Sequence, residues 1–236
     1  MKNDSVLVVI GYTDFKWYCR PLLPKNYEML TYQNKELNFI DENNYSDLGK
    51  NRTGDEICAE FRRVGINNAI AGGFDWVYFM DLDTIPAPDM LELLLVQESP
   101  FIGGAIACRG DSTKLIAHEY GSWELKDRRP PSIPNAYGTI PVAGISGASM
   151  LVHKSIFTKV GYDGYRGVEM YPGRTTCDDE FYCIKVHDKT GITPELNLNA
   201  RAWHLHSDGF AYCWFGMRQP FKRIGDKISF RGDIYE

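Results

Sequence analysis

Short, continuous hydrophobic runs are the clearest pattern in this chain. Val6–Ile10 and Trp76–Met80 are long enough for a strand and too short for a helix, so both are predicted to be strands buried on both faces of a sheet. The same kind of pattern predicts strands at 27–32, 37–40 and 100–108, in the second half of 142–152, and up to a strand end near 202–206.

The stretches between these runs carry the signals of helices. Thr53 and Glu56 have the spacing of a capping box, which predicts a helix over 53–71 that stops at two glycines. Strands that alternate with helices predict an α/β fold, here a single domain with a central, mostly parallel sheet flanked by helices. Further helices are predicted at 88–97, at 154–160 and from Thr176, whose spacing to Asp179 also fits a capping box, and a loop is predicted at 109–135.

Two carboxylates follow the second hydrophobic run. In an extended backbone Asp81 and Asp83 point to the same side, while Leu82 turns toward the core. They come at the carboxyl end of a central strand, where open α/β sheets bind their ligands. The simpler alternative is a pair of solvated turn residues. Because convergent like charges repel, we expect a cation between them, and Mn²⁺ or Mg²⁺ suits oxygen ligands.

Four residues in the first half of the chain are candidates for ligand binding. Gly11 is expected at the tip of the first strand. Asp41, at the end of a later strand, either forms a plain turn or binds a nucleobase or ribose. Arg62 and Arg63 lie on the polar side of the predicted 53–71 helix, where they either face solvent or neutralise a diphosphate.

The second half offers small residues followed by acids. Gly147 and Ala148 belong to a small-residue stretch that serves either tight sheet packing or a floor for a sugar or acceptor. Asp178 and Asp179 begin a helix, where acids are common, yet together with Glu180 they exceed what a cap requires. A carboxylate fixed at a helix start beside a cleft is suited to act as a general base.

His204 and His206 are candidates near the end of the chain. They stand two apart at a predicted strand end, so both side chains are expected on one side. Single histidines are mostly ordinary core or surface residues, whereas two in register favour a metal or phosphate site. The tail from Phe210 is aromatic and basic, and it is expected either to pack over the cleft or to become ordered when a ligand binds.

Composition narrows the class of protein. With 236 residues, 44% of them hydrophobic, the chain can build a sizeable core. A net charge of −5 argues against nucleic acid as a general partner. The sequence shows neither a long apolar run nor a secretory leader, so no transmembrane segment is expected and the cytoplasm is the predicted location. The six cysteines form no Cys-x-x-Cys pair, so reduced thiols are the simplest prediction.

Residues 55–209 resemble the GT-A fold glycosyltransferases, most closely the family 2 type of nucleotide-sugar transferase. The resemblance rests on motifs that follow one another in the family's order. They are the 62–69 helix that leads into the Asp-x-Asp of 81–83, the segment 147–161, the acid pair 178–179, where the family usually has Glu-Asp, and a histidine at 204 or 206.

The resemblance implies how the chain is organised. It implies one Rossmann-like GT-A domain over 1–236, with a nucleotide-sugar-binding half at 1–108, an acceptor-side half at 109–209 and a tail at 210–236 as a lid. Asp81, Asp83 and His204 or His206 are then the ligands of Mn²⁺ or Mg²⁺, and Asp179 is the catalytic base. Gly11, Asp41 and Arg62 or Arg63 become candidates for binding the nucleotide, and Gly147, Ala148 and Asp178 for binding the sugar or acceptor.

The implied activity is that of a metal-dependent hexosyltransferase. It moves a sugar from a UDP- or GDP-sugar to a hydroxyl of a glycan, a lipid-linked molecule or a protein, with inversion at the anomeric carbon. A retaining transferase on the same fold and a sugar nucleotidyltransferase remain alternatives, although residues 11–14 make a poor phosphate loop for the latter. An inactive nucleotide- or carbohydrate-binding module is the alternative that is not an enzyme.

Overall fold

Six strands form the centre of a mixed sheet in the order β13-β5-β10-β3-β1-β2. The computed structural model describes residues 4–23, 25–44, 53–108, 110–118, 137–162, 169–171, 174–175, 177–214, 216–224, 227–230 and 233–235. The central strands are β1 (Val6–Tyr12), β2 (Lys35–Asp41), β3 (Trp76–Asp81), β5 (Phe101–Cys108), β10 (Ser149–His153) and β13 (Glu195–Leu205). Of these strands only β10 runs against its neighbours, so the predicted mostly parallel central sheet is confirmed.

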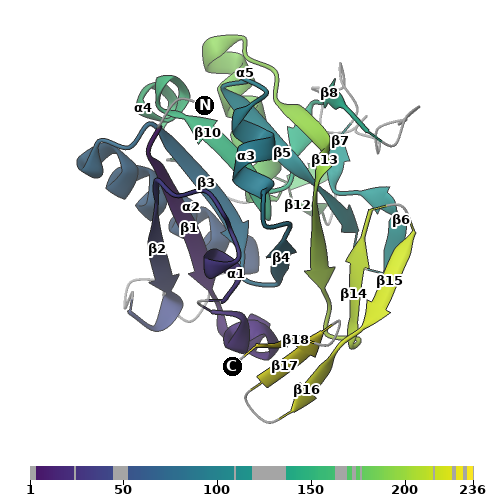
Figure 1. The fold of residues 1–236 in the computed structure, drawn as a ribbon. Coiled ribbons are helices and arrows are strands. Elements are labelled where there is room, and N and C mark those ends of the chain that lie inside the picture. Colours follow the sequence, from purple (N-terminus) through teal and green to yellow (C-terminus); the bar gives the residue numbers. More distant parts are fainter. Residues whose placement is uncertain are drawn as a thin grey trace.

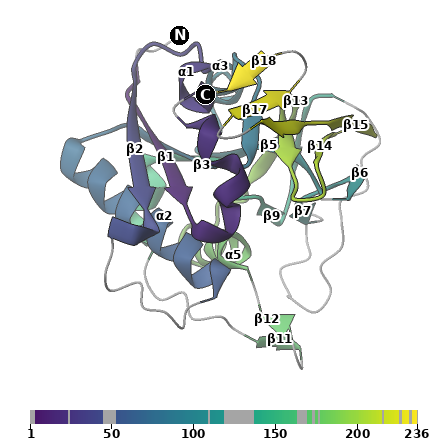
Figure 2. The ribbon, with the colours of Figure 1, turned by 90° about the horizontal axis from the view of Figure 1, so that it is seen from below.

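Helices cover both faces of this sheet (Figure 1). On one side lie the 3₁₀ segment η1 (Asp14–Leu22), α1 (Lys25–Glu28) and α3 (Met90–Leu95), and on the other α2 (Gly54–Gly72), α4 (Lys154–Val160) and α5 (Asp178–Thr190). Figure 2 shows α2 and α5 on one side of the sheet and α1 and α3 on the other. A further 3₁₀ turn, η2 (Glu42–Asn44), follows β2.

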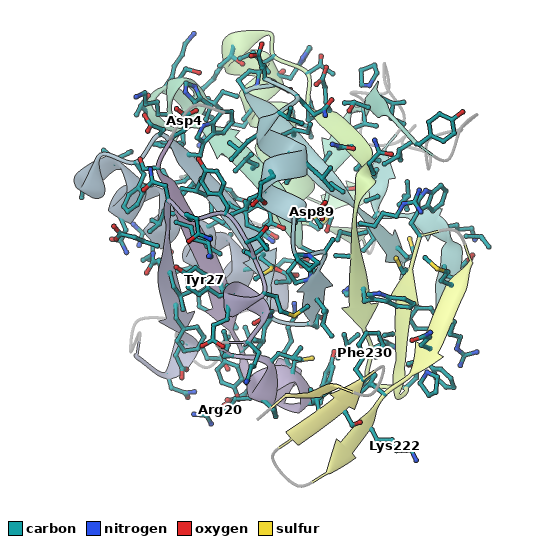
Figure 3. The ribbon with its side chains drawn as sticks, in the orientation of Figure 1. Asp4, Arg20, Tyr27, Asp89, Lys222 and Phe230 are labelled. Atoms are coloured by element: carbon teal, nitrogen blue, oxygen red, sulfur yellow. The ribbon has the colours of Figure 1, made fainter. Side chains whose placement is uncertain are left out.

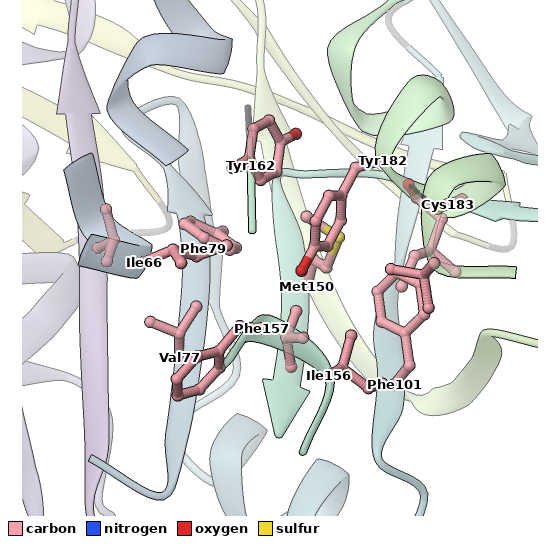
Figure 4. Close-up of a cluster of buried hydrophobic side chains, with 14 of the residues drawn as sticks. Ile66, Val77, Phe79, Phe101, Met150, Ile156, Phe157, Tyr162, Tyr182 and Cys183 are labelled. Carbon is pink, nitrogen blue, oxygen red and sulfur yellow. Dashed lines mark hydrogen bonds between the residues drawn. The ribbon is translucent and has the colours of Figure 1, made fainter. Parts of the chain in front are cut away.

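Two hydrophobic layers hold the helices to the sheet. Val8 and Ile10 of β1 pack with the η1 and α3 side, whereas Val9 between them packs with the α2, α4 and α5 side. This alternation is what a strand buried on both faces requires, so the prediction for Val6–Ile10 is confirmed. Figure 4 shows the second layer, where Tyr162 stacks on Tyr182 of α5 with ring centroids 4.4 Å apart.

The capping box predicted for α2 is confirmed, whereas α3 begins later than predicted. Thr53 and Glu56 form both hydrogen bonds of the predicted capping box. The predicted 88–97 helix is shorter, because Pro88 lies in the preceding turn and α3 begins only after Asp89. The N-cap of α5 is Cys177, and Thr176, the first residue of the predicted capping box with Asp179, lies outside the described residues.

The strand predicted at 27–32 is wrong. Residues 25–28 form the single turn α1, and the buried amide of Asn26 donates to the carbonyl oxygens of Leu82 (3.4 Å) and Thr84 (3.2 Å). A tertiary contact with a segment far along the chain therefore overrides the local aromatic pattern. The predicted strand at 37–40 is confirmed within β2.

Short strands extend and flank the main sheet. The loop predicted at 109–135 is wrong for its first part, where β6 and β7 form, and the part from residue 119 lies outside the described residues. These short strands are β4 (Thr84–Pro86), β6 (Asp111–Leu115), β7 (Ala117–His118), β8 (Thr139–Pro141), β9 (Gly144–Ile145), β11 (Glu169–Tyr171) and β12 (Arg174–Thr175).

The tail from residue 210 is built of strands. β14 (Phe210–Cys213) and β15 (Met217–Pro220) continue the main sheet beyond β13, while β16 (Lys222–Ile224), β17 (Lys227–Phe230) and β18 (Asp233–Tyr235) form a separate small sheet. β17 contacts η1, and Figure 3 shows Phe230 of β17 and Arg20 of η1 toward the same end of the molecule. Within the described residues, no helix has the length and apolarity needed to cross a bilayer.

Candidate active site

The two predicted carboxylates lie where β3 leaves the sheet. Asp81 is the last residue of β3, and Asp83 follows in the turn that leads into β4. Leu82 is fully buried, as predicted. The backbone N–H of Leu205 donates to the carbonyl oxygen of Asp83 at 2.8 Å, so the end of β13 holds this turn in place.

A lysine ammonium bridges the two carboxylates. Nζ of Lys16 lies 2.9 Å from Oδ2 of Asp81 and 3.0 Å from Oδ1 of Asp83. Lys16 is 5% exposed and Asp83 is 0% exposed, so this contact is shielded from water. The two acids converge, but the cation between them in this structure is the ammonium of Lys16 and not the predicted metal ion, so the metal site stays a prediction. The sequence analysis missed Lys16, which is a single basic residue in the aromatic stretch 15–18 after the first strand.

Electrostatics keep Asp81 ionised. Burial alone raises the pKa of its carboxyl group, but the ammonium of Lys16 and the guanidinium of Arg62 outweigh burial and lower the pKa below its usual value. Asp81 is therefore a carboxylate at neutral pH. The two cations offset the repulsion from the neighbouring Asp83.

Arg62 links the Asp81 end of the site to α5. Its Nη2 lies 3.6 Å from Oδ1 of Asp81, and its Nη1 is paired with Oδ2 of Asp178. The hydroxyl of Tyr162 donates to the same Asp178 oxygen at 3.0 Å. Arg63 does not join this group, because its guanidinium pairs with Glu60 one turn earlier on α2. Of the two candidate arginines, the structure brings only Arg62 to the acids.

Asp179 is oriented by backbone groups. Its Oδ2 accepts from the N–H of Gly147 at 2.8 Å, and its Oδ1 accepts from the N–H of Glu180 at 2.9 Å. Gly147 is required here, because a Cβ at this position would overlap the guanidinium of Arg62. The small residue predicted as an acceptor floor thus also lets Arg62 and Asp179 approach the same stretch of backbone.

A cavity of about 490 Å³ joins these groups. It is wide enough for part of a small-molecule ligand and open on one side to the chain's surface. Asp55, in the first turn of α2, lines it as well and was not predicted; burial, followed by the charge of Asp179, raises the pKa of its carboxyl group. The predicted site residues in the lining are Arg62, Asp81, Ala148, Asp178, Asp179 and His204.

The two candidate histidines have different contacts at the end of β13. His204 is buried, its Nδ1 lies 3.1 Å from the carbonyl oxygen of Ala107, and its Nε2 lies 3.6 Å from Oδ2 of Asp83. His206 follows the strand, where the chain turns, and its Nδ1 lies 3.3 Å from Oδ1 of Asp208. The structure brings His204 to the acid pair and leaves His206 outside it.

Gly11 and Asp41 have local roles in the structure. Gly11 borders a small cavity of about 20 Å³ beside Lys16 and Arg62, and a Cβ there would overlap the ring of Phe61. Asp41 ends β2, and its Oδ1 accepts from the backbone N–H of Asn43 at 2.9 Å. This is the geometry of the plain turn that was one of its two predicted roles.

The residues at the tip of β3 have the chemistry of a divalent-cation site. Asp81 and Asp83 supply carboxylate oxygens. A carbonyl oxygen can only accept, so Nδ1 of His204 carries the proton toward Ala107, and in the neutral ring Nε2 offers its lone pair toward Asp83. Among the described residues, however, no three acidic, histidine or cysteine side chains are already arranged to hold an ion. Lys16 occupies the space between the carboxylates.

Known proteins match this chain in structure and not in sequence. No family model matches it, and no curated protein matches it significantly. The crystal structure of A197 from STIV matches with a TM-score of 0.58 and 10% identity, over 92% of this chain and 93% of that chain. The crystal structure of GalNAc-T7 with UDP, GalNAc and Mn²⁺ matches with a TM-score of 0.52 and 14% identity, over 86% of this chain and 44% of that chain.

These comparisons define the class of fold. The chain is a mixed α/β domain of the GT-A-like kind, with a central, mostly parallel sheet flanked by helices. It spans less than half of the GalNAc-T7 chain, which is a glycosyltransferase. At such low identity the similarity concerns the fold, so the activity has to be argued from the site.

Proposed function

We propose that this protein is a metal-dependent glycosyltransferase, which moves a sugar from a nucleotide-sugar donor to a hydroxyl acceptor with inversion. One observation carries the proposal. The Asp81 carboxylate at the end of β3 and the Asp179 carboxylate at the start of α5 line one cavity together with Arg62, and Lys16 links Asp81 to the buried Asp83. This arrangement separates a donor-phosphate region from a general base.

The charge of the site supports a metal requirement. Among the described residues that line the cavity, the acids Asp55, Asp81, Asp178 and Asp179 outnumber the cations Lys16 and Arg62. A nucleotide sugar brings further negative charge on its diphosphate. Asp81, Asp83 and His204 would hold Mn²⁺ or Mg²⁺, which supplies the charge that stabilises the departing nucleoside diphosphate.

Arg62 is suited to the same diphosphate. It is buried and lies between Asp81 and Asp178, so its position is fixed by two carboxylates. A guanidinium held in this way can donate to a phosphate oxygen without first losing conformational freedom. We assign Arg62 to the donor side and do not include Arg63, whose charge is paired with Glu60.

Asp179 is the proposed catalytic base. Two backbone N–H groups fix its carboxylate at the wall of the cavity, which leaves further lone pairs directed to a ligand. It takes the proton from the acceptor hydroxyl as that oxygen bonds to the anomeric carbon and the bond to the diphosphate breaks. Attack from the face opposite the leaving group inverts the anomeric configuration.

The structural comparison guides the choice of the first donor to test. GalNAc-T7 was solved with UDP, GalNAc and Mn²⁺, so a UDP-sugar is the first donor to test, followed by GDP-sugars. The acceptor is a hydroxyl group of a glycan, a lipid-linked molecule or a protein.

The test compares two substitutions on the same helix. Asp179→Asn should reduce sugar transfer at least about a hundredfold, because the amide cannot accept the proton. Asp188→Asn, which changes an exposed acid of α5, is the matched control and should retain full transfer. Undiminished transfer by Asp179→Asn would refute the assignment of Asp179 as the catalytic base. NMR of the product's anomeric centre separates inversion from retention, and release of pyrophosphate would reveal a nucleotidyltransferase.

A further inference from the structure

Lys16 occupies the place that the proposed function gives to a metal ion. Its ammonium contacts one oxygen of each carboxylate, at 2.9 and 3.0 Å. These are the distances of charge-assisted hydrogen bonds, so Lys16 neutralises the pair directly and not through water. A metal ion bound by both carboxylates would therefore compete with the Lys16 ammonium for the same oxygens.

Because the acid pair is buried, either Lys16 or a metal ion has to neutralise it. Asp83 is 0% exposed, and removing the partner of a buried carboxylate is strongly destabilising. The acid pair must therefore be neutralised before a metal arrives and after it leaves. Lys16 can do this in the metal-free protein because it is tethered next to the site.

Arg62 is not equivalent to Lys16 in this respect. Its guanidinium also pairs with Asp178 and packs against Gly147, so three parts of the fold hold it. Its Nη2 reaches Oδ1 of Asp81 at 3.6 Å, which is longer than the Lys16 contacts. An incoming ion at the acid pair would displace Lys16 and leave Arg62 where it is.

A break in η1 and a small cavity lie beside Lys16. Lys16 is the kink within η1, with φ −97° and ψ 22°, so its side chain does not belong to a continuous helix. It also borders the cavity of about 20 Å³, which is about the room that one water or ammonium group needs. Oγ1 of Thr13 lines this cavity, is buried and has no hydrogen-bond partner among the described residues, so it offers an acceptor there.

We propose that Lys16 is a built-in competitor for the divalent cation: it bridges Asp81 and Asp83 in the metal-free protein and is displaced when the ion binds. The inference rests on the proposed function only in taking Asp81 and Asp83 as the metal ligands. Lys16 thereby sets the metal affinity of the site. It keeps the carboxylates neutralised between turnovers and gives them up when the metal ion supplies the positive charge.

The experiment measures Mn²⁺ binding by calorimetry, without nucleotide or acceptor. If the ammonium fills the site most of the time, apparent affinity is reduced by the fraction of protein in which the site is open. Lys16→Met should therefore bind Mn²⁺ at least about tenfold more tightly than the wild type. The double variant Lys16→Met/Asp83→Asn should lose that gain. Equal affinity of the wild type and Lys16→Met would overturn the proposal.

A second measurement uses the wild type, so it does not depend on the folding of the variant. Lys16 should be protected from an amine-acylating reagent without metal and should react several times faster with saturating Mn²⁺, as mass spectrometry of its peptide would show. Lys114, whose side chain is 60% exposed, is the control and should react at the same rate in both conditions. Continued protection of Lys16 in the Mn²⁺-bound protein would contradict its displacement.

These results are separable from the proposed activity. Tighter Mn²⁺ binding by Lys16→Met together with an absence of transfer from every nucleotide sugar would support the competition and refute the glycosyltransferase. Metal-dependent transfer together with unchanged Mn²⁺ affinity in Lys16→Met would do the reverse.

Discussion

Asp178 and Asp179 are neighbours in sequence with different surroundings. Asp178 is 3% exposed and is paired with Arg62 and hydrogen-bonded by Tyr162, so its charge is used within the fold. Asp179 lines the cavity and is held by backbone N–H groups. At the residue scale, the first acid therefore supports the site and the second is available for chemistry.

This difference predicts that the same substitution destabilises the protein more at Asp178 than at Asp179. Asp178→Asn leaves the buried Arg62 without its α5 carboxylate and should lower the free energy of unfolding by about 3 kcal/mol. Asp179→Asn keeps an oxygen that can accept from Gly147, so its cost should stay below about 1 kcal/mol. Urea denaturation of both variants measures this directly. A larger loss for Asp179→Asn than for Asp178→Asn would contradict the assignment.

At the scale of elements, the site is assembled where the ends of strands meet the starts of helices. β3 ends at Asp81, β13 ends next to the Asp83 turn, and α5 begins at Asp178. At the other end of β3, Asp75 precedes the strand and joins it to the neighbouring elements. Its carboxylate accepts from the N–H of Ser5 at 3.0 Å and pairs with Lys154 of α4 at 2.5 Å.

The Asp75 contacts predict a pH dependence of stability. Hydrogen bonding by Lys154 is the main cause that lowers the pKa of Asp75, from 3.8 to about 2, and the N–H of Ser5 adds to it. Because the folded-state pKa is depressed, the stabilisation is fully present above the unfolded-state pKa and is lost as pH falls through the folded-state pKa.

The measurement is the free energy of unfolding against pH for the wild type and Asp75→Asn. The difference between the two should be constant above about pH 5 and should shrink between about pH 4 and pH 2. Asp111→Asn is a useful comparison, because Asp111 also has a pKa lowered to about 2 but lies in an exposed hairpin. A difference for Asp75→Asn that does not change with pH would show that its contacts do not form.

Local sequence patterns predicted much of the fold. The buried strands β1, β3 and β5 and the capping box of α2 were predicted because their signals lie within a few residues of one another. The convergence of Asp81 and Asp83 was predicted as well, although Asp83 reaches it from a turn and not from the strand.

The rest of the site depends on contacts between distant segments. Lys16 meets the acids across 65 and 67 positions, and Arg62 meets Asp178 across 116. No periodicity or motif encodes such pairs in a single sequence. For the same reason the separation of His204 from His206 was not predictable, since it follows from where β13 stops against the Asp83 turn.

At the scale of the whole molecule, a GT-A-like fold brings Asp81 and Arg62 to one cavity with Asp179, an acid at a helix start. β1 to β5 and the segments between them supply Lys16, Arg62 and the acid pair, and later segments supply Gly147 and Asp179. The predicted division into a nucleotide-sugar-binding half and an acceptor-side half stays a prediction. The predicted lid role of the 210–236 tail stays a prediction. The central claim is that this cavity binds a nucleoside diphosphate through a metal at Asp81 and Asp83.

The most direct test of that claim is the thermal stability of the protein with UDP, GDP, TDP or CMP, each with and without Mn²⁺. A ligand that binds the folded state raises Tm by mass action. We predict that one nucleoside diphosphate raises Tm of the wild type only when Mn²⁺ is present, and that Asp83→Asn loses this increase while Asp188→Asn keeps it. No Tm increase with any nucleotide in the presence of Mn²⁺ would contradict the account.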